Sequence, residues 1–169
     1  RDAMDAAQSS GAGMVTATAT LDLDRAREVA SRVVDPEIPV LTIDDLGILR
    51  SVSTEGDQVV VTITPTYSGC PAMRQIEDDI ATALSRQGVE SFEVRVTHHP
   101  AWSSDWISQE GHRKLAGFGI APPTGESEVL CPRCKSDRPR MIARFGSTAC
   151  KALMVCSSCG EPFDYFKQY

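Results

Sequence analysis

The sequence predicts an α+β protein in which a small mixed sheet, with helices on one face, precedes a β ribbon stapled by a metal ion. Two observations lead to this prediction. Residues 21–96 show helical and strand periodicities in the order helix–strand–strand–helix–strand, the pattern of a compact layer of helices on a sheet. Residues 129–169 contain two C-x-x-C pairs separated by 21 residues, a spacing close to that of tetrahedral metal sites.

The first predicted helix covers residues 21–34 and packs through one apolar face. That face consists of Ala26, Val29, Ala30, Val33 and Val34. Asp22 or Asp24 can cap the start of the helix. Asp35-Pro36 ends it, because proline disfavours a helical conformation in the residue before it.

A hairpin and a second helix–strand unit follow. Residues 48–53 and 59–63 are the two predicted strands of the hairpin. The second helix covers residues 72–86, and a third strand with alternating apolar residues covers 92–96. The apolar stripe of the second helix consists of Met73, Ile76, Ile80 and Leu84.

Composition sets the expected domain limits. Residues 1–20 are rich in Ala, Ser, Gly and Thr, which predicts a disordered tail without the apolar run of a signal peptide. The α+β domain is expected over 21–120, with short helices at 102–107 and 113–118. A Pro- and Gly-containing linker is expected over 121–128 and the ribbon over 129–169. The predicted ribbon strands are 141–145, 152–155 and 163–166.

The four cysteines of the two pairs, Cys131, Cys134, Cys156 and Cys159, are the strongest chemical signal in the chain. Each C-x-x-C turn aims two sulfurs at one point, so two turns form a site of four thiolates that suits Zn²⁺ or a single iron ion. A pair of disulfides or a redox C-x-x-C is the alternative. A metal is favoured because so short a segment cannot bury enough apolar area to fold alone.

The net charge of −6 is unevenly distributed. Residues 1–128 contain 10 Lys/Arg and 20 Asp/Glu, whereas residues 129–169 contain 7 Lys/Arg and 3 Asp/Glu. A mildly basic module on an acidic body lacks the concentrated basic face of a nucleic-acid binder, but it suits docking onto proteins. No apolar run approaches the ~20 residues that span a bilayer. We therefore expect a cytoplasmic protein that binds neither nucleic acid nor membrane.

Cys70 is the candidate functional thiol outside the ribbon. It lies between Gly69 and Pro71, directly before the second helix. Free amides and the partial positive charge of a helix N-terminus favour the thiolate, which can bind a metal or attack an electrophile. The alternative is a buried structural cysteine.

Three further residues are candidates beside Cys70. Asp35 and Glu37 flank a rigid proline and could bind a hard metal ion or orient a loop, or could simply be a solvated pair after a helix. Cys150 is an auxiliary thiol inside the ribbon: a core residue, a spare metal ligand, or a residue behind the ligands.

Catalytic motifs are absent from the sequence. It contains no nucleotide-binding glycine motif and no H-E-x-x-H motif, and it assembles no Ser–His–Asp set. His98 and His99 point in opposite directions on an extended chain, so they are not expected to share a metal ion. The sequence therefore favours a protein that is not an enzyme.

Several strings in the chain resemble known families. Asp35-Pro-Glu-Ile-Pro and Ser68-Gly-Cys-Pro71 are similar to the SufT-like iron–sulfur assembly domain. Longer strings, running from Asp35 to Gly47, Pro65 to Met73, Pro100 to Ile107, Phe145 to Lys151 and Glu161 to Lys167, resemble the PaaD family. PaaD proteins are the D subunits of the phenylacetyl-CoA 1,2-epoxidase system of aerobic phenylacetate breakdown. The resemblance covers about residues 24–169.

The resemblance implies an accessory protein that helps to mature an iron or iron–sulfur centre of an epoxidase subunit, the iron–sulfur reductase being the favoured client. It implies a functional thiol at Cys70 with Asp35 and Glu37 beside it, a transient iron–sulfur cluster as cargo, and structural zinc in the ribbon.

Three alternatives stay open from the sequence. The chain could be a docking subunit of the oxygenase without cluster handling, or an electron carrier with iron in the four-thiolate site. A thiol enzyme using Cys70 would need a base that the sequence does not place nearby. Oligomeric state is open too, with a homodimer among the options.

Overall fold

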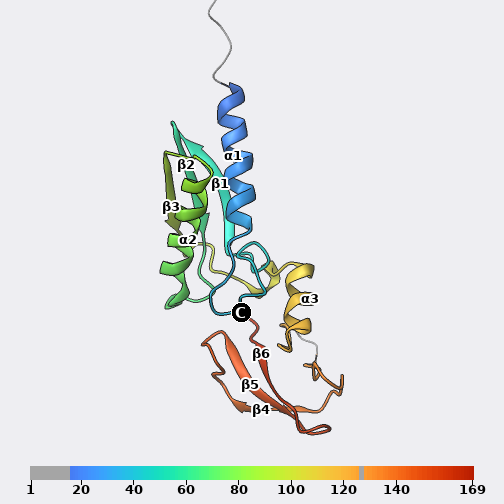
Figure 1. The fold of residues 1–169 in the computed structure, drawn as a ribbon. Coiled ribbons are helices and arrows are strands. Elements are labelled where there is room, and N and C mark those ends of the chain that lie inside the picture. Colours follow the sequence, from blue (N-terminus) through green and yellow to red (C-terminus); the bar gives the residue numbers. More distant parts are fainter. Residues whose placement is uncertain (1–15, 126–127) are drawn as a thin grey trace, which may run out of the picture.

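The computed structural model describes residues 16–125 and 128–169, which form two connected modules (Figure 1). The first module contains α1 (Thr16–Ser31), β1 (Leu49–Glu55), β2 (Gln58–Ile63), α2 (Ala72–Arg86), β3 (Phe92–Val96), the short helix η1 (Ser104–Trp106) and α3 (Gln109–Gly117). The ribbon contains β4 (Pro139–Ala143), β5 (Lys151–Cys156) and β6 (Pro162–Phe166). None of the helices in the described residues combines the length and apolar character that crossing a bilayer takes.

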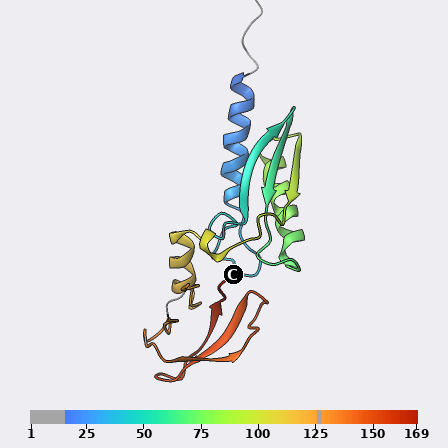
Figure 2. The same cartoon turned by 180° about the vertical axis from the view of Figure 1, so that it is seen from behind.

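The sheet of the first module has the strand order β1-β2-β3. β1 and β2 are an antiparallel hairpin, and α2 crosses over to place β3 parallel to β2. α1 packs on β1, β2 and α2, and α2 packs on β3, so both helices cover the same face. Figure 2 shows the opposite face of the sheet, which has no helix on it. This arrangement confirms the predicted fold class.

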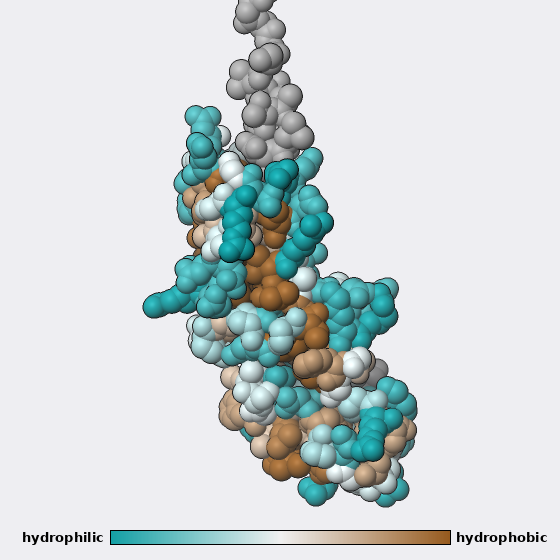
Figure 3. All heavy atoms as spheres, viewed as in Figure 1, coloured by the Kyte–Doolittle hydropathy of each residue, from teal (hydrophilic) through white to brown (hydrophobic). Residues whose placement is uncertain are grey.

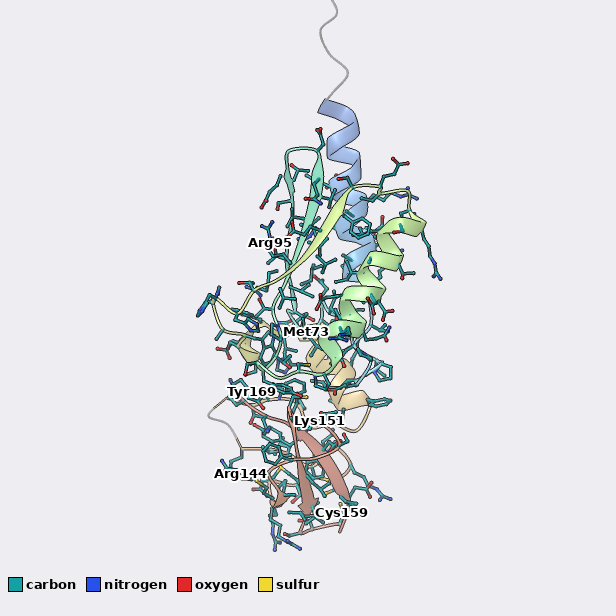
Figure 4. All side chains as sticks on the ribbon, turned by 90° about the vertical axis from the view of Figure 1, so that its left-hand side faces the viewer. Met73, Arg95, Arg144, Lys151, Cys159 and Tyr169 are labelled. Atoms are coloured by element: carbon teal, nitrogen blue, oxygen red, sulfur yellow. The ribbon has the colours of Figure 1, made fainter. Side chains whose placement is uncertain are left out.

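The core of this module lies between the helices and the sheet, where the predicted stripe of α2 is buried. On the open face, the guanidinium of Arg95 on β3 pairs with Glu93 on its own strand and with Glu55 on β1. Figure 4 shows Arg95 on the side of the sheet away from α1 and α2. Figure 3 shows hydrophobic atoms at the surface along the C-terminal half of α1 and toward the ribbon.

The ribbon is an antiparallel sheet of order β4-β5-β6 that joins the first module end to end. Its own small core contains Ala121, Cys131, Met154, Cys156 and Phe163. The end of the ribbon next to the first module, by contrast, belongs to the main core, which is the core of that module. There the rings of Trp102 and Phe166 lie 6.0 Å apart. The Trp102 indole N–H also donates a hydrogen bond of 2.9 Å to the Leu46 carbonyl. The two modules therefore share apolar contacts at one junction.

Several boundaries differ from those expected. α1 begins at Thr16, so residues 16–20 of the expected tail are helical, while residues 1–15 lie outside the described residues. Extending the helix from residue 21 back to residue 16 costs little free energy, because each added residue gains a backbone hydrogen bond. α3 begins at Gln109 because the Ser108 hydroxyl caps it by accepting from the Gly111 N–H.

Ala121 was expected in the linker but lies beside the ribbon sheet. It is buried and pairs with Tyr165 of β6, donating its N–H to the Asp164 carbonyl at 2.8 Å. The Phe166 N–H donates back to the Ala121 carbonyl at 2.9 Å. Ala121 thus extends the ribbon sheet, a long-range pairing that a Pro- and Gly-containing composition does not reveal.

Candidate functional site

The four ribbon cysteines converge at the far end of the ribbon. Their sulfurs all lie within 4.8 Å of one another, with Cys131 to Cys159 at 3.8 Å and Cys134 to Cys156 at 3.6 Å. Four sulfurs at about 2.3 Å from a tetrahedral zinc ion would be about 3.8 Å apart. All six cysteines are free thiols. The donor set and its spacing fit a tetrahedral metal ion.

Two similar turns hold these sulfurs. In each turn the residue after the second cysteine has a positive φ, 61° at Lys135 and 76° at Gly160. Each of these residues donates its N–H at 2.9 Å to the carbonyl of the first cysteine of its pair. The hydroxyls of Ser136 and Ser158 lie 2.7 Å apart and link the two turns. The backbone conformation of both turns therefore positions the four sulfurs.

The groups around the Cys156 sulfur favour its thiolate form. Burial works against its thiolate, but the backbone N–H groups of Cys159 and Ser158, together with the neighbouring thiols, lower the pKa of Cys156 to about 6, while the pKa of Cys134 is raised. The Ser158 N–H lies 3.4 Å from the Cys156 sulfur. The thiolate is the form of cysteine that binds a metal ion, so a thiol that ionises readily favours metal binding.

Cys70 occupies the end of the loop between β2 and α2, where it is half-buried. Its N–H donates to the Tyr67 carbonyl at 3.1 Å, and its carbonyl accepts from the Met73 N–H at 3.4 Å. The helix start favours the thiolate of Cys70, as expected, but burial and neighbouring acidic groups outweigh it. Burial raises the pKa of Cys70, the Ala72 N–H lowers it less, and Glu37, Asp35 and Cys150 raise it further.

Asp35 and Glu37 face the same region from the segment after α1. The Asp35 carboxylate is buried, and its Oδ1 accepts hydrogen bonds from the N–H groups of Glu37 (2.8 Å) and Ile38 (2.7 Å). Asp35 therefore shapes the turn that presents Glu37. Burial raises the pKa of Asp35 despite these bonds, and burial together with Asp35 raises the pKa of Glu37.

The ribbon adds Cys150 and Lys151 to this region. Cys150 is 4% exposed and lies in the main core, against which Cys70 also packs. It precedes β5 at the end opposite Cys156, roughly 20 Å away along the strand. Cys150 is therefore a core residue and not a spare ligand of the four-cysteine cluster. Figure 4 shows Lys151 at the junction and Cys159 at the far end of the ribbon.

Lys151 is the feature that sequence reasoning missed. Its side chain is buried, and its Nζ lies 3.5 Å from Asp164 Oδ2. Its charge lowers the pKa values of Asp35, Glu37 and Cys150, opposing the burial that raises them. Its position directly after Cys150 was the available signal, but nothing local indicates that it meets carboxylates more than 110 residues earlier.

A cavity of about 250 Å³ opens beside the loop that bears Cys70. Residues of that loop line it together with aromatic residues of both modules: Thr64, Pro65, Thr66, Tyr67, Ser68, His98, Ala101, Trp102 and Tyr169. The Thr64 hydroxyl is buried without a hydrogen-bond partner. His98 and His99 are both exposed.

Comparisons with known proteins divide the chain in the same way. A family model described as iron–sulfur cluster assembly protein matches residues 24–97, and one described as PaaD zinc beta ribbon domain matches residues 120–167. The chain is 48% identical over 144 residues to the D subunit assigned to the 1,2-phenylacetyl-CoA epoxidase of Escherichia coli K12, covering 81% of this chain and 87% of that protein.

The first module alone has further relatives. The chain is 33% identical over 79 residues to the Fe-S protein maturation auxiliary factor SufT of Staphylococcus aureus, covering 46% of this chain and 89% of that protein. A crystal structure of a DUF59 domain from Bacillus anthracis aligns with a TM-score of 0.53 at 30% identity, covering 58% of this chain and 94% of that chain.

Proposed function

This chain belongs to the PaaD family of 1,2-phenylacetyl-CoA epoxidase D subunits, and on that premise we propose that it assists assembly or delivery of an iron–sulfur or iron centre to a partner subunit. The favoured partner is the iron–sulfur reductase of the epoxidase, in the cytoplasm. The observation that supports this best is the placement of Cys70, a half-buried thiol at a helix start beside two carboxylates, within the module that matches iron–sulfur assembly proteins.

We assign the cargo-binding role to Cys70. A sulfur at the end of a loop can bind iron and release it to a client, provided that the protein does not surround the iron ion on all sides. Asp35 fixes the turn through two backbone hydrogen bonds, and Glu37 offers a carboxylate toward the same region. We propose an accessory role and not catalysis, because relatives of the first module are named Fe-S protein maturation auxiliary factors.

We propose that the resident metal of the ribbon is zinc, held by Cys131, Cys134, Cys156 and Cys159. Zinc has no redox chemistry, so its role there is to hold the two turns together and stabilise the ribbon. Iron in the same four sulfurs would instead give an electron carrier. Metal analysis of protein purified without oxygen separates the two: a colourless protein with one zinc supports the proposal, and a red protein with iron contradicts it.

The test of the proposed function is made in cells that depend on this chain for ring epoxidation. In cells with Cys70→Ser, cluster content of the reductase and phenylacetyl-CoA epoxidation should fall to the levels of cells without the chain. Gln75→Ala, an exposed change on the helix that follows Cys70, is the matched control and should behave as wild type. Normal cluster content with Cys70→Ser would exclude the thiol from maturation.

A docking role is the second candidate, favoured by exposed apolar residues on and beside β4. Met141 and Ile142 on the edge strand β4 of the basic ribbon are each 50% exposed, and Phe145, just after that strand, is 68% exposed. Exposed apolar residues of this size are typical of protein contact surfaces. Co-purification with the epoxidase at fixed stoichiometry would favour permanent docking, whereas association with immature reductase alone would favour maturation.

A further inference from the structure

We infer that the free edge of the ribbon is the surface through which this chain docks onto an acidic protein partner. This docking edge consists of Arg140, Met141, Ile142, Arg144 and Phe145, on β4 and just after it. The inference rests on the proposed function, because a maturation factor has to bind its client. It deepens that function by naming the surface and the chemistry of the partner.

The apolar side chains of the docking edge lie in solvent, although the ribbon has little core of its own. Met141 and Ile142 are half exposed, and Phe145 is more exposed than either. Figure 3 shows hydrophobic atoms at the surface of the ribbon, where Figure 1 places β4. In the register of β4 with β5, the neighbours Arg140 and Met141 point to opposite faces of the sheet. The exposed groups therefore cover the rim of the sheet, a convex shape that fits a cleft in a partner.

The backbone of this edge is protected against pairing with a further strand. Pro139 at the start of β4 has no N–H to donate, and the pairing with β5 shifts register between Met141 and Ala143. Proline, bulges and charged side chains are the means by which natural edge strands avoid strand addition. The partner therefore contacts the side chains of the docking edge and does not extend the ribbon sheet.

Phe145 is held in place despite its exposure. The Lys167 Nζ lies 4.7 Å from the centre of the Phe145 ring, a cation–π contact, and also donates to the Arg144 carbonyl at 3.4 Å. The backbone of Lys167 is fixed in turn, because its N–H donates to the Cys150 carbonyl at 3.0 Å. A ring that is already positioned loses little conformational entropy on binding, so Phe145 is the anchor of the docking edge.

Charge decides which kind of partner fits this surface. Within the described residues, Arg133 and Lys151 of the ribbon pair with acidic side chains, whereas Arg138, Arg140 and Arg144 form no ion pair. Arginine, methionine and aromatic residues together are enriched in protein interfaces. Arginines beside apolar anchors complement a protein surface whose acidic side chains surround an apolar contact.

An anionic phospholipid surface would meet the same arginines. The whole chain, however, has a net charge of −6, and the excess of acidic residues lies in residues 1–128. An extended anionic surface repels that part of the chain, whereas a local acidic patch on a protein faces the docking edge alone. The charge distribution therefore favours a protein partner over a membrane.

The test measures binding of the full chain to each purified epoxidase subunit, including reductase depleted of its cluster, by surface plasmon resonance at about 50 and about 500 mM NaCl. We expect one subunit to bind, with an association rate that falls about tenfold or more at the higher salt concentration. Arg140→Glu combined with Arg144→Glu should lower the association rate about tenfold at low salt. Phe145→Ala should raise the dissociation rate about tenfold, because it removes the anchor.

The matched control is Arg27→Glu combined with Arg86→Glu, which makes the same change in net charge at exposed positions of α1 and α2 and should bind as wild type does. Cys70→Ser should also bind as wild type does, so docking and cluster handling are tested separately. Zinc content and melting of each variant are measured in parallel. The salt dependence of the wild-type chain needs no variant.

Three results would overturn the inference. They are wild-type rates in the docking-edge variants, association that does not change with salt, and no binding to any subunit. Binding to phosphatidylglycerol vesicles that is lost in the double arginine variant, without binding to a subunit, would replace the protein partner with a membrane. Each of these results leaves the maturation role of Cys70 to the cluster content of cells with Cys70→Ser.

Discussion

Gly47 shows how one residue without a side chain fixes the approach of two segments. Its φ is +66°, and a Cβ there would lie 2.6 Å from the Trp106 Cβ and 2.7 Å from the Trp106 carbonyl oxygen. Glycine is needed twice over, for backbone conformation and for space. η1 can therefore pack directly on the turn before β1.

Gly47→Ala should lower the free energy of unfolding by roughly 2–4 kcal/mol, from backbone strain and overpacking together. Gly56→Ala is the matched control, because Gly56 also has a positive φ (+60°) but a Cβ there meets nothing within 4 Å. Gly56→Ala should lower the free energy of unfolding by only about 1 kcal/mol. Equal losses in urea unfolding would show that contact with Trp106 contributes nothing.

Asp45 ties α3 to the same turn. Its Oδ2 accepts hydrogen bonds from Lys114 Nζ at 2.6 Å and from the Thr42 N–H at 2.9 Å. Burial works against the carboxylate, but these two partners outweigh it and hold the pKa of Asp45 below its ordinary value of 3.8. Because the pKa is lower in the folded state, the stabilisation is present above pH 3.8 and is lost as the pH falls below it.

Asp45→Asn should therefore lower the free energy of unfolding by roughly 1–3 kcal/mol at pH 7, because it removes a charge-assisted hydrogen bond. The difference from wild type should shrink as the pH drops below 3.8. Urea unfolding between pH 7 and pH 3 measures this. Lys114→Met should remove most of the same stabilisation, and the double variant should lose little more than either change alone. A difference that stays constant with pH would rule out the ionic explanation.

At the scale of elements, we expect the ribbon to depend on its metal. Its own buried core contains four small and medium residues and Phe163, which is too little apolar area to order three strands. One cysteine turn precedes β4 and the other connects β5 to β6, so a metal ion bound by both would replace the missing core.

Cys134→Ser should release the ribbon metal and increase amide hydrogen exchange in β4, β5 and β6, while α2 keeps its protection. The reason is that three sulfurs hold the ion much less tightly than four and that ribbon folding is coupled to binding. Cys150→Ser serves as the control, because Cys150 lies at the other end of β5 and should keep the ribbon zinc. Retained metal and unchanged exchange in Cys134→Ser would contradict the structural role.

At the scale of the whole molecule, the junction makes one unit of two modules. Phe166 is 1% exposed and belongs to the main core, although it lies in the last strand of the ribbon. Lys151 brings a buried cation to Asp35 and Glu37 across the same junction. Loosening this contact should alter the Cys70 site without touching the ribbon cluster.

Phe166→Ala should lower the free energy of unfolding by about 3–5 kcal/mol and speed alkylation of Cys70, because the cavity it leaves uncouples the ribbon end from the first module. Zinc content should stay the same. Phe145→Ala is the matched control, because Phe145 is 68% exposed, and it should change stability by less than about 0.5 kcal/mol. Melting curves and timed alkylation with mass spectrometry measure both effects. An unchanged alkylation rate in Phe166→Ala would mean that the ribbon does not shield Cys70.

The sequence alone predicted the features that depend on near neighbours. The stripe from Met73 to Leu84 follows from helical period, and the hairpin follows from alternation around Gly56, because these patterns are local consequences of backbone geometry. The four-cysteine cluster was predicted because metal-binding turns have a fixed spacing. Candidate roles for Cys70, Asp35 and Glu37 came from strings of adjacent residues and remain proposals.

What the tertiary structure decided was which distant residues meet. It placed Cys150 in the main core instead of with the ribbon cluster, brought Lys151 to Asp35, and joined Ala121 to β6. It also reversed the expected shift in the pKa of Cys70, because burial and neighbouring acidic groups outweigh the helix start. Such contacts leave no periodic trace in the sequence, since desolvation and charge–charge interactions depend on distance in space and not on separation along the chain.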